Sequence, residues 1–257
     1  MTTAKSKKSP ATVPSQLQTN LTLLGLPFMA EHHPDLANRA VRDGLGHLDY
    51  LAKLTEGELN LRRDRATLRR VKNARFPVIK TLDQFSWNWP KSINRMAVQN
   101  LFRLQFHKDN ANIIFLGAVG LGKTHLATAL GYAACLAGKS VLFSTAVDAI
   151  NTLAAAQATN RLKAELKKYL SPSLLILDEL GYLPIDKLGA DLLFQIISQR
   201  YERGSIIVTS NRAFKQWPEI FNNDSMLTSA ILDRLLHHAE TMVIEGKSYR
   251  MKDQTDY

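Results

Sequence analysis

The residues best suited to chemistry lie in a glycine-rich segment, GAVGLGKT at 117–124, which fits the Walker A pattern G-x-x-x-x-G-K-S/T. Its glycines let the backbone wrap closely around a phosphate, and the helix that follows adds its positive N-terminal dipole end. In this pattern Lys123 reaches the β- and γ-phosphates and the Thr124 hydroxyl binds Mg²⁺. The predicted phosphate-binding residues are Gly117, Gly120, Gly122, Lys123, Thr124 and His125. Of these, we expect His125 to act mainly by packing. The competing interpretation is a glycine-rich turn without a ligand.

A second motif, LLILDE at 174–179, is an apolar run that ends in two acids. In open α/β sheets ligands bind at the carboxyl ends of the strands, where these acids would lie. We expect Asp178 to hold Mg²⁺, largely through water, and Glu179 to polarise the attacking water as a general base. The alternative is a strand end with solvated acids.

Three further polar residues are candidates for contact with phosphate. Asn211 ends the apolar run SIIVTSN, where it could bond the attacking water or the γ-phosphate, or simply favour a turn. Arg234 lies at the margin of the apolar face of the helical segment 226–238 and could serve a neighbouring subunit as an arginine finger. Its alternative is a surface salt bridge to Asp233 or Glu240. Arg250 could contact the phosphates of its own subunit.

The elements that must position these residues alternate between strands and helices from residue 111 onward. Strand-like runs are expected at 112–116, 140–144, 174–177, 205–209 and 242–244, with a helix at 123–137 and further helical stretches between the runs. This alternation favours a parallel sheet covered on both faces. The run KSVLFST lies between the two motifs and predicts an additional strand inserted between the phosphate-loop strand and the acid-bearing strand.

The region before the sheet divides into three expected parts. Residues 1–15 read as a flexible basic tail, and 16–76 as a helical domain that Pro27, Pro34 and two glycines divide into three or four helices. Residues 77–110 form a connector with a short helix and the cluster Phe85, Trp87 and Trp89. We expect this cluster to pack two domains together, and the alternative is that it stacks on bases or on adenine. The domain at 111–257 follows.

Positive charge is confined to the first part of the chain. Residues 1–108 hold 18 Lys and Arg against 8 Asp and Glu, whereas residues 109–257 hold 15 of each. This asymmetry predicts a polyanion-binding region. On a helix, six cations spread over about half of the circumference and favour contact with a DNA backbone over base readout. They are Arg62, Arg63, Arg65, Arg69, Arg70 and Lys72. A solvated charged face and a docking site for an acidic protein are the alternatives.

Composition excludes several classes of protein. Cys135 is the single cysteine, so an intramolecular disulfide and a cysteine-rich zinc motif are both impossible, and we expect this thiol to be buried and inert. The adjacent histidine pairs, His32–His33 and His237–His238, would point apart on a helix, which argues against zinc. No apolar run approaches the roughly 18 residues of a membrane helix. We therefore expect a cytoplasmic protein without a membrane partner.

The ordered segments GAVGLGKTH, LLILDELGYLP, IIVTSNR, AILDRLLHHA and IEGKSYR resemble the IstB-type transposition helper ATPases, which are AAA+ proteins related to DnaC and DnaA. The resemblance covers about residues 80–252. It implies an α/β P-loop AAA+ fold with a parallel sheet and no full C-terminal lid domain, ATP and Mg²⁺ as ligands, and an adenine pocket lined by TLDQF at 81–85. It also implies a sensor 1 role for Asn211, the arginine finger for Arg234 and a sensor 2 role for Arg250.

The resemblance further implies an ATPase that oligomerises on duplex DNA as a ring or helix, deforms it and presents it to an IstA-type transposase. Two alternatives remain open. A DnaC-like replicative helicase loader would use the same core with single-stranded DNA and a helicase. A nucleotide-gated DNA architectural protein would show negligible turnover, although the presence of Glu179 argues against it.

Overall fold

The computed structural model describes residues 16–251, and these form two compact units that divide between Ala66 and Thr67, within one long helix. The predicted flexible tail at 1–15 lies outside the described residues. Within that described span, no helix is long and apolar enough to cross a membrane. The division falls earlier than the expected boundary at residue 76 because Val71, Ala74 and Phe76 pack into the core of the second unit.

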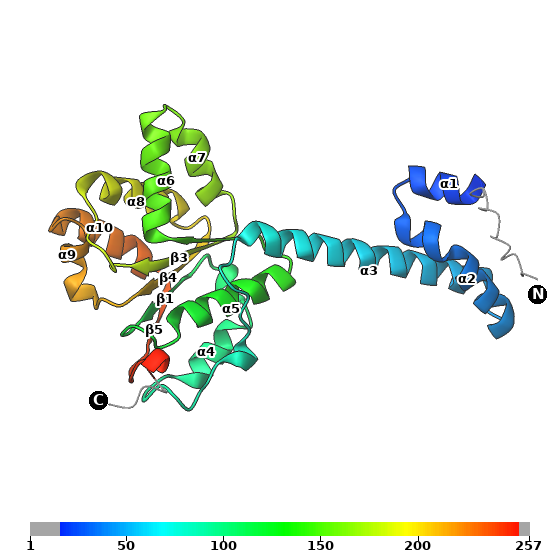
Figure 1. Cartoon of the computed structure of the whole chain (residues 1–257), viewed down its shortest axis with the longest axis horizontal. Coiled ribbons are helices and arrows are strands. Elements are labelled where there is room, and N and C mark those ends of the chain that lie inside the picture. The colour runs from blue at the N-terminus through cyan, green and yellow to red at the C-terminus, as the bar shows by residue number, and fades with distance from the viewer. Residues whose placement is uncertain (1–15, 252–257) are drawn as a thin grey trace, which may run out of the picture. The chain divides into compact units, whose positions relative to one another are not determined.

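The first unit is helical, as expected, and contains α1, α2 and most of α3 (Figure 1). Their bounds are Gln16–Leu23, Pro27–Asp43 and His47–Ala74. Pro34 lies inside α2 and does not divide it. Proline cannot donate a hydrogen bond to the carbonyl four residues earlier, which belongs to Ala30, but Nδ1 of His33 lies 3.2 Å from that oxygen.

The second unit is a five-stranded parallel sheet between two layers of helices (Figure 1). The strands are β1 Asn112–Leu116, β2 Val141–Thr145, β3 Leu174–Leu180, β4 Ser205–Ser210 and β5 Ala239–Val243. The helices are α4 Arg95–Leu101, α5 Lys123–Leu136, α6 Ala146–Ala158, α7 Leu162–Leu170, α8 Lys187–Arg200, α9 Trp217–Ile220 and α10 Ser225–Leu236. Short 3₁₀ turns are η1 Leu82–Gln84, η2 Gln105–His107, η3 Phe214–Gln216 and η4 Tyr249–Met251. The predicted parallel sheet is confirmed.

Alternate residues of the strands enter two separate cores. In β1, Ile114 and Leu116 pack toward α6, α8 and α10, whereas Ile113 and Phe115 pack toward α5 and the end of α3. Both faces are buried, which explains why the strands read as nearly continuous apolar runs. The ends of β1, β3 and β4 therefore hold fixed positions at one edge of the sheet.

The strand order is β2-β3-β4-β1-β5, which corrects one prediction. The KSVLFST strand, β2, lies at the sheet margin beside β3, and β4 occupies the place between the phosphate-loop strand and the acid-bearing strand. The expectation followed the order of the motifs along the chain. Helical crossovers, however, let parallel strands skip positions, and β4, the strand that directly precedes Asn211, is inserted there instead.

Candidate nucleotide-binding site

The glycine-rich loop joins the end of β1 to the start of α5, as the Walker A pattern predicts. Gly122 has a left-handed φ of 87°, and an added Cβ would lie 2.6 Å from the ring of Phe85. Glycine is therefore required there both by backbone conformation and by space. Lys123 begins α5, and its ammonium donates to the carbonyls of Gly117 and Ala118, each at 2.7 Å.

The Lys123 ammonium is held in a partly desolvated position. Burial lowers its pKa, while the negative charges of Asp178 and Glu179 act in the opposite direction. Two loop carbonyls are its hydrogen-bond acceptors in this structure. A phosphate anion would be a stronger acceptor for the same ammonium, because hydrogen bonds between charged groups are about twice as strong as neutral ones.

Asp178 lies at the end of β3 and is almost fully buried, with 3% of its surface exposed. Burial raises the pKa of its carboxyl, and hydrogen bonds from Thr209 and Thr124 and the charge of Lys123 oppose that rise. The Thr124 hydroxyl lies 3.0 Å from both carboxylate oxygens. Mg²⁺ prefers such hard oxygen ligands, so this hydroxyl and carboxylate fit the predicted metal site.

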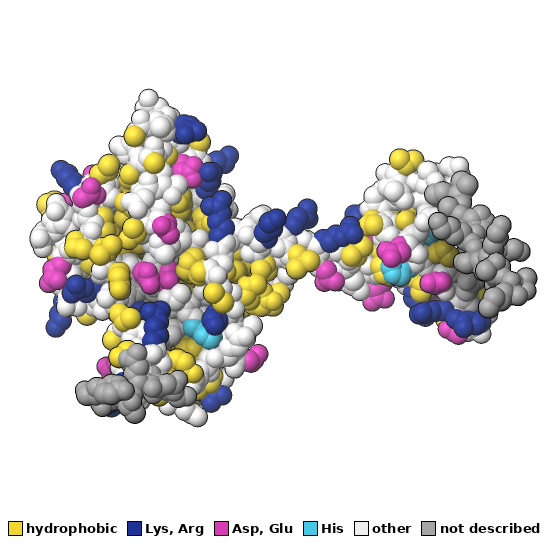
Figure 2. Space-filling model, in the orientation of Figure 1, with side chains coloured by type: hydrophobic (Ala, Val, Ile, Leu, Met, Phe, Trp, Pro, Cys, Tyr) yellow, Lys and Arg dark blue, Asp and Glu magenta, His cyan; other side chains and the backbone are white. Residues whose placement is uncertain are grey.

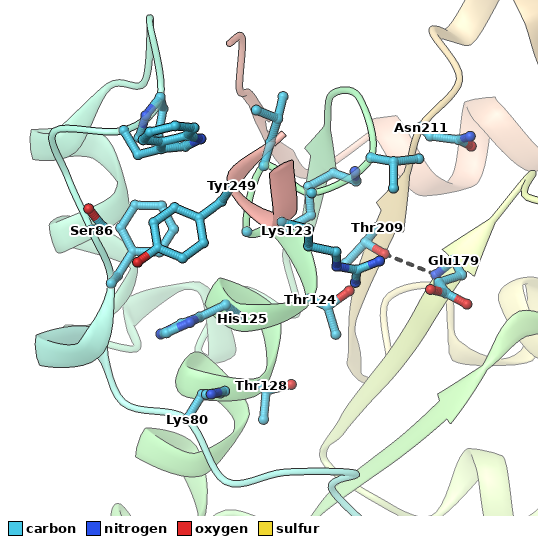
Figure 3. Close-up of a pocket in the computed structure, with 18 of the residues that line it drawn as sticks. Lys80, Ser86, Lys123, Thr124, His125, Thr128, Glu179, Thr209, Asn211 and Tyr249 are labelled. Carbon is cyan, nitrogen blue, oxygen red and sulfur yellow. Dashed lines mark hydrogen bonds between the residues drawn. The ribbon is translucent and has the colours of Figure 1, made fainter. Parts of the chain in front are cut away.

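A pocket of about 600 Å³ lies beside these residues at the carboxyl edge of the sheet (Figure 3). Its wall comes from the glycine-rich loop, the connector, the ends of β3 and β4, and the segment after β5. The predicted site residues that line it are Gly120, Gly122, Lys123, Thr124, His125, Glu179, Asn211 and Arg250. Gly117 and Asp178 lie behind this wall, where they bond Lys123 and Thr124 respectively.

Arg234, the predicted arginine finger, is not among the residues that line this pocket. Its guanidinium donates to the carbonyl of Ala230 at 2.8 Å and lies over the ring of Phe194 at 5.0 Å. These contacts replace the alternative ion pair with Asp233 or Glu240. The position of Arg234 outside the pocket of its own subunit is compatible with an arginine finger that acts in the pocket of a neighbouring subunit. That role stays a prediction.

The connector contributes the apolar wall. Gln84 and Phe85, from the segment that resembles an adenine pocket, both line the cavity. Phe85 makes edge contacts with Trp87 and His125, at ring distances of 5.0 and 5.5 Å. Nε2 of His125 also lies 2.9 Å from the Thr81 carbonyl, which fits the packing role expected for this histidine. The aromatic cluster thus packs within the second unit.

Residues 244–251 are here called the C-terminal strap. Sequence analysis predicts a site residue in this segment only at Arg250. The strap begins where the Ile244 N–H donates to the carbonyl of Leu116 at 2.8 Å. It continues past Trp89, whose indole donates to the Lys247 carbonyl at 2.9 Å, and the Tyr249 N–H then donates to Gly120 at 2.9 Å. Arg250 is therefore carried on a segment bonded to the glycine-rich loop. In the described part of the chain, η4 is the one helical element after β5.

Sequence analysis misses Thr209 and Tyr249 as residues of this pocket. Trp89, for which stacking on adenine is the alternative to packing between domains, also lines it. Thr209 lies in SIIVTSN, the same apolar run from which Asn211 is predicted as a site residue. Its place as a polar residue at the carboxyl end of an apolar strand is the signal that could have found it.

The six predicted DNA-binding cations differ in their surroundings. Arg62 pairs with Glu58 at 3.3 Å and donates to the carbonyl of Gly25 at 3.0 Å. Arg70 donates to the carbonyl of Cys135 at 3.0 Å. The other four are exposed, and Figure 2 shows basic side chains along α3. They are Arg63, Arg65, Arg69 and Lys72.

The two histidines after α10 do not point apart. The helix ends at Leu236, so His237 and His238 are not two successive residues within a helix, and their ring centroids are 4.1 Å apart. Together with Glu202, they offer possible ligand atoms within 4.8 Å of one another. All three residues are exposed, and Nδ1 of His237 is 2.8 Å from the Tyr201 hydroxyl.

Comparison with known proteins agrees with this architecture. The chain is 43% identical over 238 residues to the "Insertion sequence IS232 putative ATP-binding protein" of Bacillus thuringiensis subsp. berliner, which covers 93% of this chain and 95% of the relative. It is 41% identical over 239 residues to the corresponding IS21 protein of Pseudomonas aeruginosa, with 93% and 90% covered.

Solved structures are similar in fold. The crystal structure of the DnaC helicase loader matches with a TM-score of 0.52 and 25% identity, over 68% of this chain and 99% of that one. AMPPCP-bound DnaA from Aquifex aeolicus matches with a TM-score of 0.56 and 23% identity, over 69% and 54%. The predicted P-loop AAA+ fold is confirmed. The family model described as "IstB-like ATP binding protein" matches residues 19–256, and the chain belongs to that family.

Proposed function

We propose that the protein is an ATPase that assembles on duplex DNA with ATP and prepares that DNA for a transposase of the IstA type. The observation that carries the ATPase part is the convergence of Lys123, Thr124 and Glu179 on one pocket, with Asp178 behind them. These residues come from two motifs far apart in the sequence. The names of the relatives, which are ATP-binding proteins of insertion sequences, support the transposition part.

In this proposal each side chain has one task. Lys123 leaves the loop carbonyls and bonds the β- and γ-phosphates, while Asn211 holds the attacking water or the γ-phosphate. Glu179 lies on the pocket side of β3 and polarises the attacking water. Mg²⁺, held by Thr124 and Asp178, would neutralise charge on the phosphates. Arg234 would enter the pocket of a neighbouring subunit, so assembly would be a condition for hydrolysis.

The DNA-binding part of the proposal rests on charge. The first 108 residues carry all of the net charge of +10, and the exposed cations of α3 offer forks that match phosphate oxygens. Contact dominated by phosphates gives affinity that falls steeply with salt and little preference for sequence. We expect both properties for this chain, with cytoplasmic localisation.

The first experiment is sedimentation on a random duplex of several tens of base pairs, with no nucleotide, with ATP and with ADP. Glu179→Gln would slow hydrolysis and keep the ATP state in place. A large, defined particle that forms only with ATP is the expected result. Added transposase should then bind that particle and not the ADP sample.

The resemblance to the DnaC helicase loader favours one second candidate, a loader of a replicative helicase. That function requires single-stranded DNA and a helicase as partners. Assembly on single strands with no shift on duplex would favour it over the proposal. Turnover near zero at saturating DNA would instead favour an architectural protein that uses ATP as a structural ligand.

A further inference from the structure

Thr209 joins the two acids of the site through one hydroxyl group. It lies in β4, with 1% of its surface exposed, beside the end of β3. Its hydroxyl donates to Oδ1 of Asp178. The same hydroxyl accepts the backbone N–H of Glu179 at 2.9 Å (Figure 3). A hydroxyl has one proton and two lone pairs, so both bonds can exist at the same time.

The backbone of β3 explains why Glu179 needs this partner. Leu174–Leu177 pair in register with Ser205–Val208, but the pairing then slips, and Leu180 stands opposite Ser210. Glu179 within the slip has a left-handed φ of 60°. Such a conformation is strained in a non-glycine residue and persists only where the surroundings hold it. The slip takes the Glu179 N–H out of the hydrogen-bond ladder between the strands, and the Thr209 hydroxyl accepts it instead.

Because of the slip, the neighbouring carboxylates of Asp178 and Glu179 point in different directions. Asp178 is buried and bonded to Thr124, whereas Glu179 lines the pocket. We propose that Thr209 is a positioning residue, which fixes the metal-binding acid and the water-polarising acid in one arrangement through its hydroxyl. The inference rests on the proposed ATPase function, because it assigns Thr209 a task in that reaction.

Thr209 also differs from Thr124, the other hydroxyl bonded to Asp178. Thr124 belongs to the predicted Mg²⁺ ligands, so its hydroxyl must serve the metal when ATP binds. Thr209 lies outside that ligand set and can keep its bonds throughout. Loss of its hydroxyl should therefore damage the chemical step more than nucleotide binding, for which the glycine-rich loop and Lys123 suffice.

The test compares Thr209→Val with Thr209→Ser. Valine keeps the shape and loses the hydroxyl, whereas serine keeps the hydroxyl and loses a methyl group. Ser205→Ala is the matched control, since Ser205 is buried in the same strand and its hydroxyl has no hydrogen-bond partner among residues 16–251. The readouts are kcat and KM for ATP with DNA present, the Kd of a fluorescent ATP analogue, and urea unfolding.

We expect Thr209→Val to lower kcat on the order of 100-fold, the loss typical of a small misplacement of catalytic groups, with the analogue Kd unchanged. Thr209→Ser should restore most of kcat, and Ser205→Ala should behave like the parent. If the valine variant is unfolded, Thr209→Ala is assayed at a temperature at which its unfolding curve shows it folded. The same loss of kcat is expected.

Two results would overturn the inference. One is wild-type kcat in a folded variant that lacks the hydroxyl. The other is a serine variant as slow as the valine variant, which would assign the effect to the methyl group. The ATPase rate of Glu179→Gln distinguishes failure of the inference about Thr209 from failure of the proposed function. If that variant hydrolyses ATP at the parental rate, the ATPase assignment of Glu179 fails first, whatever Thr209 does.

Discussion

Gly120 is the place where the glycine-rich loop and the C-terminal strap meet, and Gly120→Ala tests that contact. Gly120 has φ of 78°, and an added Cβ would lie 2.0 Å from Oγ and 2.9 Å from Cβ of Ser248. The left-handed backbone alone costs alanine about 1–2 kcal/mol. Overpacking typically adds about 1–3 kcal/mol, so we expect a loss of about 2–5 kcal/mol in unfolding free energy.

Gly138→Ala is the matched control for this loss. Gly138 has a φ of 87°, close to that of Gly120, but an added Cβ would meet nothing within 4 Å. It should therefore lose only the conformational part. The difference between the two variants in urea unfolding, monitored by circular dichroism, measures the steric part. Gly120→Ala should also bind a fluorescent ATP analogue more weakly, whereas Gly138→Ala should bind normally.

A second change identifies the strap as the source of the overlap. Ser248→Gly removes both side-chain atoms nearest the new methyl group, which leaves the Ser248 Cα at 3.2 Å. In the Gly120→Ala background it should recover much of the stability. The reasoning is refuted if Gly120→Ala is no less stable than Gly138→Ala, or if Ser248→Gly recovers nothing.

Three further predictions concern other residues. Arg234→Ala should keep ATP affinity and lose turnover on the order of 10³-fold, and mixing it with Glu179→Gln should restore turnover, because each subunit supplies what its neighbour lacks. Burial, with the charges of Lys139 and Arg200, lowers the pKa of His107 to about 4, whereas the unfolded chain keeps the ordinary value of 6.5. As pH falls through that interval the unfolded state binds the proton first, so stability is lost. Between pH 7.5 and pH 5, the free energy of unfolding in urea should fall by about 1 kcal/mol, a value that allows for the partial exposure of His107. The His107→Gln variant should not show this loss. Burial also raises the pKa of the Cys135 thiol to about 11, so iodoacetamide at pH 8 should label it rapidly only in denaturant.

Each of these has an opposing result. Parental turnover by Arg234→Ala alone, or a mixture no faster than its parts, would exclude a shared active site. Equal pH dependence in the parent and His107→Gln would show that another group controls acid stability. Rapid native labelling of Cys135 would show that α5 opens readily.

The sequence predicts well those elements whose position depends on residues close together in the chain. The strand at 112–116, the helix that begins at Lys123 and the apolar run into Asp178 lie where periodicity and the glycine pattern place them. Each depends on residues adjacent in the chain. The same holds for the start of β4, which the SIIVTS run specifies.

The features that the sequence did not reveal depend on contacts between distant segments. The place of β2 at the sheet margin follows from packing of the crossover helices, which leaves no mark in KSVLFST itself. The proposed role of Thr209 depends on a slip in the pairing of another strand. The strap is held by its own backbone, which accepts the Trp89 indole N–H and donates to the Gly120 carbonyl. The side chains of the strap take no part in these bonds, so its sequence gives no sign of them. The continuity of α2 through Pro34 is likewise not predicted by helix propensity.

The position of β1 in the sheet has a consequence for synthesis on the ribosome. Its two neighbours, β4 and β5, and the strap that closes the glycine-rich loop are all made after it. Chains emerge N-terminus first at about 5–20 residues per second. The basic helix α3 therefore emerges many seconds before all residues of the candidate nucleotide pocket have been made. Under the proposed function, a nascent chain would bind nucleic acid during that interval, before it can bind ATP.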